Sequence, residues 1–122
     1  MNYASKAYAK VAKQTAGPRD LEASLLLKAA AQLQAVHDSW GDKPKGLNDA
    51  LMYNRRLWTI FLDAVTREDN KLPAQTRNNL TKIGAFVIGE TFSLMTKPKP
   101  NHLQSIISIN RRIAAGLRGK AA

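Results

Sequence analysis

The chain has 122 residues, a length typical of one domain, and 44% of them are hydrophobic, which is enough to form a core. It contains no cysteine, which excludes disulfide scaffolds, thiolate metal sites and cysteine nucleophiles. Lysine and arginine number 19 against 9 acidic residues, so the formal net charge is +10. This charge favours acidic partners, nucleic acids among them. We therefore expect one small basic domain spanning residues 1–122.

The first segment with helical composition runs from Tyr3 to Thr15 and carries lysine at every third or fourth position. No apolar stretch follows these lysines, so a secretory signal is not expected. No run in the chain approaches the ~20 apolar residues of a membrane span, so we expect a cytoplasmic protein with no membrane association. Residues 1–16 are predicted to form a shorter N-terminal helix that could be mobile, and that either completes the core or covers a binding groove.

Four longer segments with apolar residues at helical spacing follow, separated by turns rich in glycine and proline. They predict helices over Pro18–Trp40, Leu47–Arg67, Pro73–Met95 and Asn101–Leu117. No segment of useful length alternates with the period of a strand. The predicted fold class is therefore all-α, an antiparallel bundle of four main helices plus the shorter N-terminal helix.

Several residues suit the ends of these helices. Pro18 and Pro73 suit first-turn positions, where the missing N–H costs nothing. Gly41 suits a stop after the first long helix, and Asn101 suits the N-cap of the last one.

One segment is apolar on nearly every side. The stretch Ile83–Gly89 has no polar face on a helix, so it is predicted to be buried between other helices. Gly84 and Gly89 lower the helix propensity there and could permit the close approach of a neighbouring helix.

Two of the predicted helices share a pattern. Residues 47–57 and 103–113 align without gaps, their apolar positions coincide, and each contains Asn-Arg-Arg. Either an ancient duplication or chance overlap between amphipathic helices accounts for this match. In both helices the asparagine, Asn54 or Asn110, falls on the apolar stripe. We expect these two side chains to be at least partly buried, hydrogen-bonded and able to fix the register between helices.

Motifs for the common catalytic classes are missing. The two histidines, His37 and His102, lack the spacing of metal ligands, and no glycine-rich phosphate loop or nucleophile motif is present. We therefore expect no enzymatic activity, no cofactor, no metal and no small-molecule substrate.

The basic charge is spread along the chain, with two arginine pairs. Arg55, Arg56, Arg111 and Arg112 are the candidate RNA-binding residues. No known nucleic-acid motif accompanies them, and both tryptophans fall on core faces, so a solvated helix surface is the simpler interpretation.

Several short stretches resemble, in their order and spacing, the FlaF family of flagellar regulators. The main ones are Pro18–Ala23, Ala50–Phe61, Asn70–Pro73 with Arg77, and Ile109–Leu117. That family often has an acidic residue where this chain has Ala74–Thr76. The resemblance implies a positive role in flagellin production and filament assembly, without catalysis. It also implies association with flagellin and with FlbT, a regulator that acts on flagellin messenger RNA.

Residues 14–22 are also similar to the start of the FliS family of flagellin export chaperones, although Gly17 stands where serine is usual. This similarity implies a protein that holds unpolymerised flagellin by its terminal segments. The candidate flagellin-binding residues are Tyr3, Tyr8, Leu21, Leu25, Leu26, Ile106, Ile109 and Ile113.

Two functions follow from these resemblances. The favoured one is a flagellin-binding chaperone and positive regulator of flagellin synthesis and secretion in bacterial flagellum assembly. The alternative is an RNA-associated post-transcriptional regulator of flagellin messenger RNA, acting alone or with FlbT.

Overall fold

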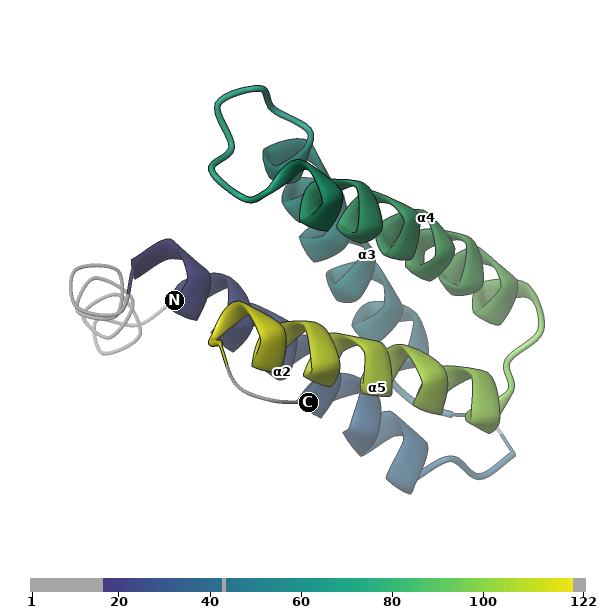
Figure 1. The fold of residues 1–122 in the computed structure, drawn as a ribbon. Helices are drawn as coiled ribbons and strands as arrows, with labels where there is room; N and C mark the ends of the chain where they lie inside the picture. Colours follow the sequence, from purple (N-terminus) through teal and green to yellow (C-terminus); the bar gives the residue numbers. More distant parts are fainter. Residues whose placement is uncertain (1–16, 43, 120–122) are drawn as a thin grey trace.

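The computed structural model describes residues 17–42 and 44–119, which form four α-helices and no strand (Figure 1). The helices are α2 (Gly17–Asp38), α3 (Leu47–Val65), α4 (Ala74–Thr96) and α5 (Pro100–Leu117). The predicted all-helical class is confirmed for this part of the chain. The N-terminal helix predicted for residues 1–16 lies outside the described residues.

The helix ends agree with the sequence prediction to within a few residues. Pro18 lies in the first turn of α2 as predicted, and Gly41 adopts a left-handed φ of 58° in the loop after it. Pro73 is the residue before α4 rather than its first residue. The prediction of Asn101 as an N-cap is wrong, because α5 begins at Pro100 and Lys99 precedes it. Proline is favoured at this first position since its φ is already helical.

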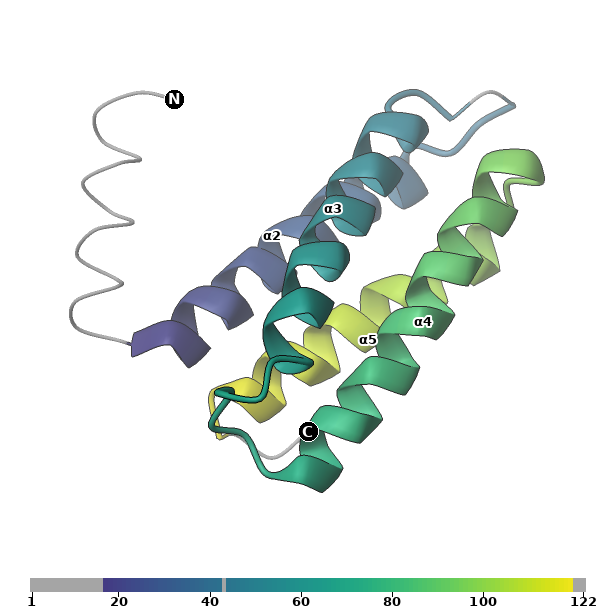
Figure 2. The same ribbon diagram turned by 90° about the horizontal axis from the view of Figure 1, so that it is seen from above.

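The four helices pack as neighbours around a central core. The most extensive packing joins α2 to α5, less joins α3 to α4 and α2 to α3, and the least joins α4 to α5. In Figure 2 the chain reverses its direction from each helix to the next. Within the described residues, α3 and α5 do not pack side by side, so they face each other across the bundle.

The core is made by the apolar stripes that the sequence predicts. On α3 the side chains of Leu51, Trp58 and Val65 are at most 1% exposed. The rings of Trp58 and Phe61 meet edge to face, with centroids 5.5 Å apart. Such an arrangement is favourable for aromatic pairs beyond their buried area.

The prediction that Ile83–Gly89 is buried on all sides is wrong. Gly84 and Val87 are buried, but Phe86 is 52% exposed and Gly89 is also exposed. The reason is the arrangement of the helices: α4 packs closely on α3 and only slightly on α5, so none of the described helices covers one face of this apolar segment.

At Gly84 of α4, the Leu62 side chain of α3 occupies the space that a Cβ atom would need. A Cβ atom built at Gly84 would lie 2.5 Å from Cδ2 of Leu62, whereas a Cβ at Gly89 would meet no atom within 4 Å. The predicted close approach is therefore confirmed at Gly84 and absent at Gly89.

Candidate functional site

A groove that is apolar at its centre runs along the seam between α4 and α5. Its centre is a cavity of about 420 Å³ lined by Lys82, Ile83, Phe86, Ile109, Arg112 and Ile113. A neighbouring cavity of about 380 Å³ shares Ile83, Arg112 and Ile113 with the first and extends to Leu72 and Leu117. On the other side, a cavity of about 410 Å³ shares Phe86, Ile109 and Arg112 and extends to Asn101 along a polar wall of Gln104, Ser105 and Ser108. Each of these cavities shares lining residues with its neighbour, and we call the three together the α4–α5 groove.

The groove exists because α5 carries a second apolar stripe beside its buried one. Ile109, Ile113 and Leu117 recur at four-residue spacing, which places them on one side of the helix, and all three are half-buried. On the opposite wall, α4 contributes Ile83 and Phe86. Because α4 and α5 pack only slightly against each other, these side chains are left without full cover.

The structure divides the predicted flagellin-binding residues. Ile109 and Ile113 lie in the α4–α5 groove. Leu26 and Ile106 need correction as groove residues, because they are 1% and 0% exposed and belong to the core. Both fall on the main apolar stripes of their helices, which face inward.

The remaining candidates do not line this groove. Leu21 and Leu25 are half-buried on α2 and line none of its three cavities. Tyr3 and Tyr8 lie outside the described residues.

Sequence reasoning missed Phe86, the one aromatic residue among the described residues that line the three cavities. It assigned the whole of Ile83–Gly89 to the interior. The composition of Ile83–Gly89 was the signal that could have found it. A helical segment that is apolar on every side offers more apolar surface than two neighbouring helices can cover, so part of it is left exposed.

Two cationic side chains are part of the lining of the central cavity. Lys82 on α4 and Arg112 on α5 line the same central cavity, and neither forms an ion pair with another described residue. Arg19 lines the end of the groove and lies 3.4 Å from Glu22. Burial raises the pKa of the Glu22 carboxyl, and the adjacent Arg19 guanidinium partly offsets this.

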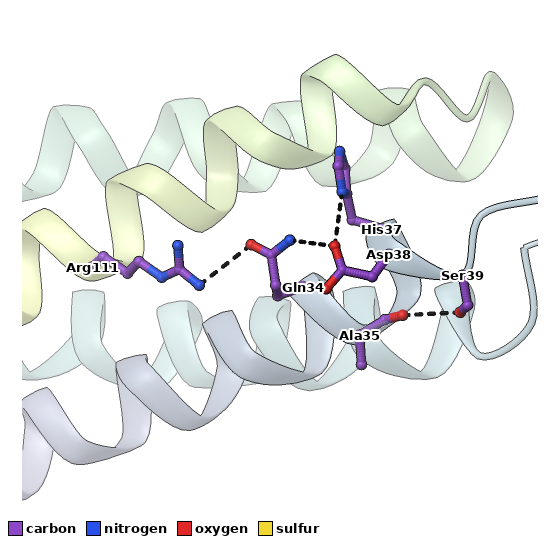
Figure 3. Close-up of polar contacts among 6 residues, drawn as sticks. All are labelled: Gln34, Ala35, His37, Asp38, Ser39 and Arg111. Atoms are coloured by element: carbon purple, nitrogen blue, oxygen red, sulfur yellow. Dashed lines mark hydrogen bonds and ion pairs between the residues drawn. The ribbon is translucent and has the colours of Figure 1, made fainter.

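Arg111, next to Arg112 in the chain, points to a different helix (Figure 3). Its guanidinium donates a hydrogen bond of 3.3 Å to Oε1 of Gln34 on α2. The Gln34 amide in turn donates to Oδ1 of Asp38 at 2.8 Å, and Nδ1 of His37 lies 3.5 Å from the same oxygen. These contacts, that of Gln34 above all, hold the pKa of Asp38 below its usual value.

The four candidate RNA-binding arginines do not gather into one patch. Cζ of Arg55 lies 5.4 Å from the centroid of the Phe92 ring, between α3 and α4. Arg56 is exposed on α3. Arg111 faces α2 and Arg112 faces the groove.

Asn54 and Asn110 meet at the centre of the bundle, and both are fully buried. Nδ2 of Asn110 donates to Oδ1 of Asn54 at 2.7 Å, and the Trp58 indole N–H donates to Oδ1 of Asn110 at 2.9 Å. The prediction of two buried, hydrogen-bonded asparagines is confirmed. Because they come from helices on opposite sides of the core, the pair fixes the axial register of α3 against α5.

Asn70 and Arg77, two of the residues that carry the family resemblance, stabilise the turn between α3 and α4. The side-chain amide of Asn70 donates to the carbonyl oxygen of Ala64 at 3.0 Å, and its oxygen accepts from the backbone N–H of Leu72 at 2.9 Å. The Arg77 guanidinium donates to the carbonyl oxygen of Arg67 at 3.1 Å. The Asn70 and Arg77 side chains thus bond to the carbonyl oxygens of Ala64 and Arg67, which also accept backbone N–H groups in the turn after α3.

The end of the bundle where α4 meets α5 is polar. His102 lies 3.0 Å from Glu90, with Lys97 and Lys99 nearby along a separate cavity of about 460 Å³. Among residues 17–42 and 44–119, no three histidine or acidic side chains gather as they would around a metal ion. Within the same residues, no helix is both long and apolar enough to cross a membrane.

Comparison with known protein families supplies the identity. The profile of the family described as flagellar protein FlaF matches residues 4–117. The chain belongs to the FlaF family. This confirms the resemblance read from the sequence and makes the chain a flagellar protein. The match spans all four described helices of this FlaF chain, including both walls of the α4–α5 groove. Curated proteins and solved structures give no match to it.

Proposed function

We propose that this FlaF-family protein binds flagellin in the cytoplasm, as a chaperone and positive regulator of its synthesis and secretion during flagellum assembly. In this proposal the protein is a non-catalytic antiparallel bundle and flagellin occupies the α4–α5 groove. Family membership supports the flagellar role. The single observation that carries the binding role is the groove itself, in which Phe86, 52% exposed, lines the same cavity as Ile83, Ile109 and Ile113.

A groove between two helices suits a partner that forms a helix only on binding. Such a partner lays its apolar face between the walls, and its ordering entropy keeps the complex reversible. Complete burial of a large apolar side chain is worth roughly 1.5–3 kcal/mol, so covering the exposed half of Phe86 contributes about 1 kcal/mol. Contacts with Ile109 and Ile113 add to this.

Calorimetric titration of monomeric flagellin into the full chain tests the proposal. We expect one-to-one binding, weakened about fivefold by Phe86→Ser, since about 1 kcal/mol corresponds to that factor. Phe92→Ser is the matched control: Phe92 lies on the same helix and is 51% exposed, but it packs under Arg55 rather than lining the groove. No heat and no co-elution at tens of micromolar rejects flagellin binding, and equal losses in both variants reject the groove.

The second candidate, an RNA-associated regulator acting alone or with FlbT, is favoured by the net charge of +10. It predicts RNA binding that weakens steeply with salt and falls in an Arg111→Gln, Arg112→Gln double variant. Absence of an RNA mobility shift at low salt rejects it. The separation of its four arginines over different faces makes flagellin binding the better-supported proposal.

A further inference from the structure

The lining of the α4–α5 groove carries positive charge and no negative charge. Across its three cavities, the charged side chains among the described residues are Arg19, Lys82 and Arg112. Lys82 and Arg112 belong to opposite walls and line the same central cavity. A partner seated there meets a cation on each side of its apolar face.

At the end of the groove, Glu22 pairs with Arg19, with 3.4 Å between Oε1 and Nη1. Three other acidic side chains pair with residues outside the groove. Asp20 accepts from Arg118 at 3.0 Å, Glu90 lies 3.0 Å from His102, and Asp63 pairs with Arg67 at 3.1 Å. None of these carboxylates lines the three cavities. Lys82 and Arg112 are both exposed and form no ion pair among the described residues, so their charges are available to a partner.

The length of the groove sets the length of the partner. Along α5 it is lined from Asn101 to Leu117, and at a rise of ~1.5 Å per residue this is about 24 Å. A helix of about four turns fills it. When the apolar stripe of such a helix occupies heptad positions a and d, the flanking positions e and g lie on either side of that stripe.

We propose that the α4–α5 groove selects an amphipathic helix whose apolar stripe is flanked by carboxylates on both edges, which pair with Lys82 and Arg112. The inference rests on the proposed function in using the same groove, and it adds the charge pattern of the segment that binds. Apolar contact supplies affinity, and the two cations supply the choice among amphipathic helices.

Two designed peptides of about four turns test this selection. Both carry the same leucine stripe at a and d, one with glutamate and the other with lysine at e and g. Binding to the full chain is measured by fluorescence anisotropy at low and at physiological salt. We expect the glutamate peptide to bind at least about tenfold more tightly, with the difference shrinking as salt rises.

Adjacent arginines provide the variant and its control. Arg112→Glu is expected to weaken the glutamate peptide about tenfold and to strengthen the lysine peptide. Arg111→Glu makes the same change in net charge one residue away, but Arg111 faces α2 through Gln34 and is expected to leave the preference unchanged. Circular dichroism and the unfolding midpoint confirm that both variants are folded.

The outcomes separate this inference from the proposed function. Equal affinity for the two peptides, no binding of either, or the same effect of both charge reversals overturns the inference. If flagellin binds the chain and Arg112→Glu leaves that binding unchanged, the charge selection is overturned and the flagellin role stands. If the glutamate peptide behaves as expected while flagellin does not bind, the inference is supported and the flagellin role falls.

Discussion

The contact between Gly84 and Leu62 makes a quantitative prediction about the α3–α4 interface. A methyl group added at Gly84 would lie 2.5 Å from Cδ2, 2.8 Å from Cγ and 2.9 Å from Cδ1 of Leu62. All three distances are too short, and since they include the branch point, the whole Leu62 side chain has to move. Gly89, on the same helix, has nothing within 4 Å of its added methyl group.

The two glycines therefore respond in opposite directions to the same change. Replacing glycine by alanine inside a helix is worth about 1 kcal/mol in helix propensity, and Gly89→Ala is expected to gain this amount. Gly84→Ala gains the same but incurs overpacking of about 1–3 kcal/mol, so its net effect ranges from neutral to about 2 kcal/mol destabilising. The variants should differ by about 1–3 kcal/mol.

Urea unfolding followed by circular dichroism measures both free energies of unfolding. Leu62→Ala removes the obstructing side chain, so Gly84→Ala made in that background should become stabilising by about 1 kcal/mol. If Gly84→Ala stabilises the unmodified chain as much as Gly89→Ala does, the close approach of α3 and α4 at this point is refuted.

Two further predictions concern polar groups. Asn110→Ala leaves the Trp58 indole N–H and the side-chain Oδ1 of Asn54 buried without these partners, so we expect it to lower the free energy of unfolding by about 3 kcal/mol. Asn54→Ala removes only one bond of Asn110, so we expect a loss of about 1–2 kcal/mol. Equal losses in urea unfolding would contradict the network. Because burial raises the pKa of Glu22, folding favours the protonated carboxyl over the ionised one. The stability that this adds is present at low pH and is lost as the pH rises through the folded-state pKa. Glu22→Gln should therefore be more stable than the unmodified chain at neutral pH and equal to it below pH 4.5, and an advantage that persists in acid would contradict this.

The helices and most of the core could be predicted from the sequence. Apolar residues at helical spacing mark the buried face of α3, and Leu51, Trp58 and Val65 on that stripe are indeed buried. The same reasoning placed Asn54 and Asn110 inside, because a residue on the apolar stripe follows the stripe whatever its polarity. Local spacing is sufficient wherever a helix has one clearly apolar side.

The candidate site could be predicted only in part. Ile109 and Ile113 were identified from α5, but Phe86 was assigned to the interior and Ile106 to the groove. A stripe shows which side of its own helix is apolar, but it does not show how closely the neighbouring helix approaches.

The sequence by itself determined the all-helical class, the four helical segments and the two inward-facing asparagines, since these depend on composition and on spacing within one segment. Only the tertiary structure decided that α3 and α5 lie across the core from each other, which brings Asn54 within 2.7 Å of Asn110. It also decided that α4 and α5 pack only slightly, which leaves Phe86 and Ile109 in an open groove. Both outcomes depend on the packing of whole helices against one another, which no single segment encodes.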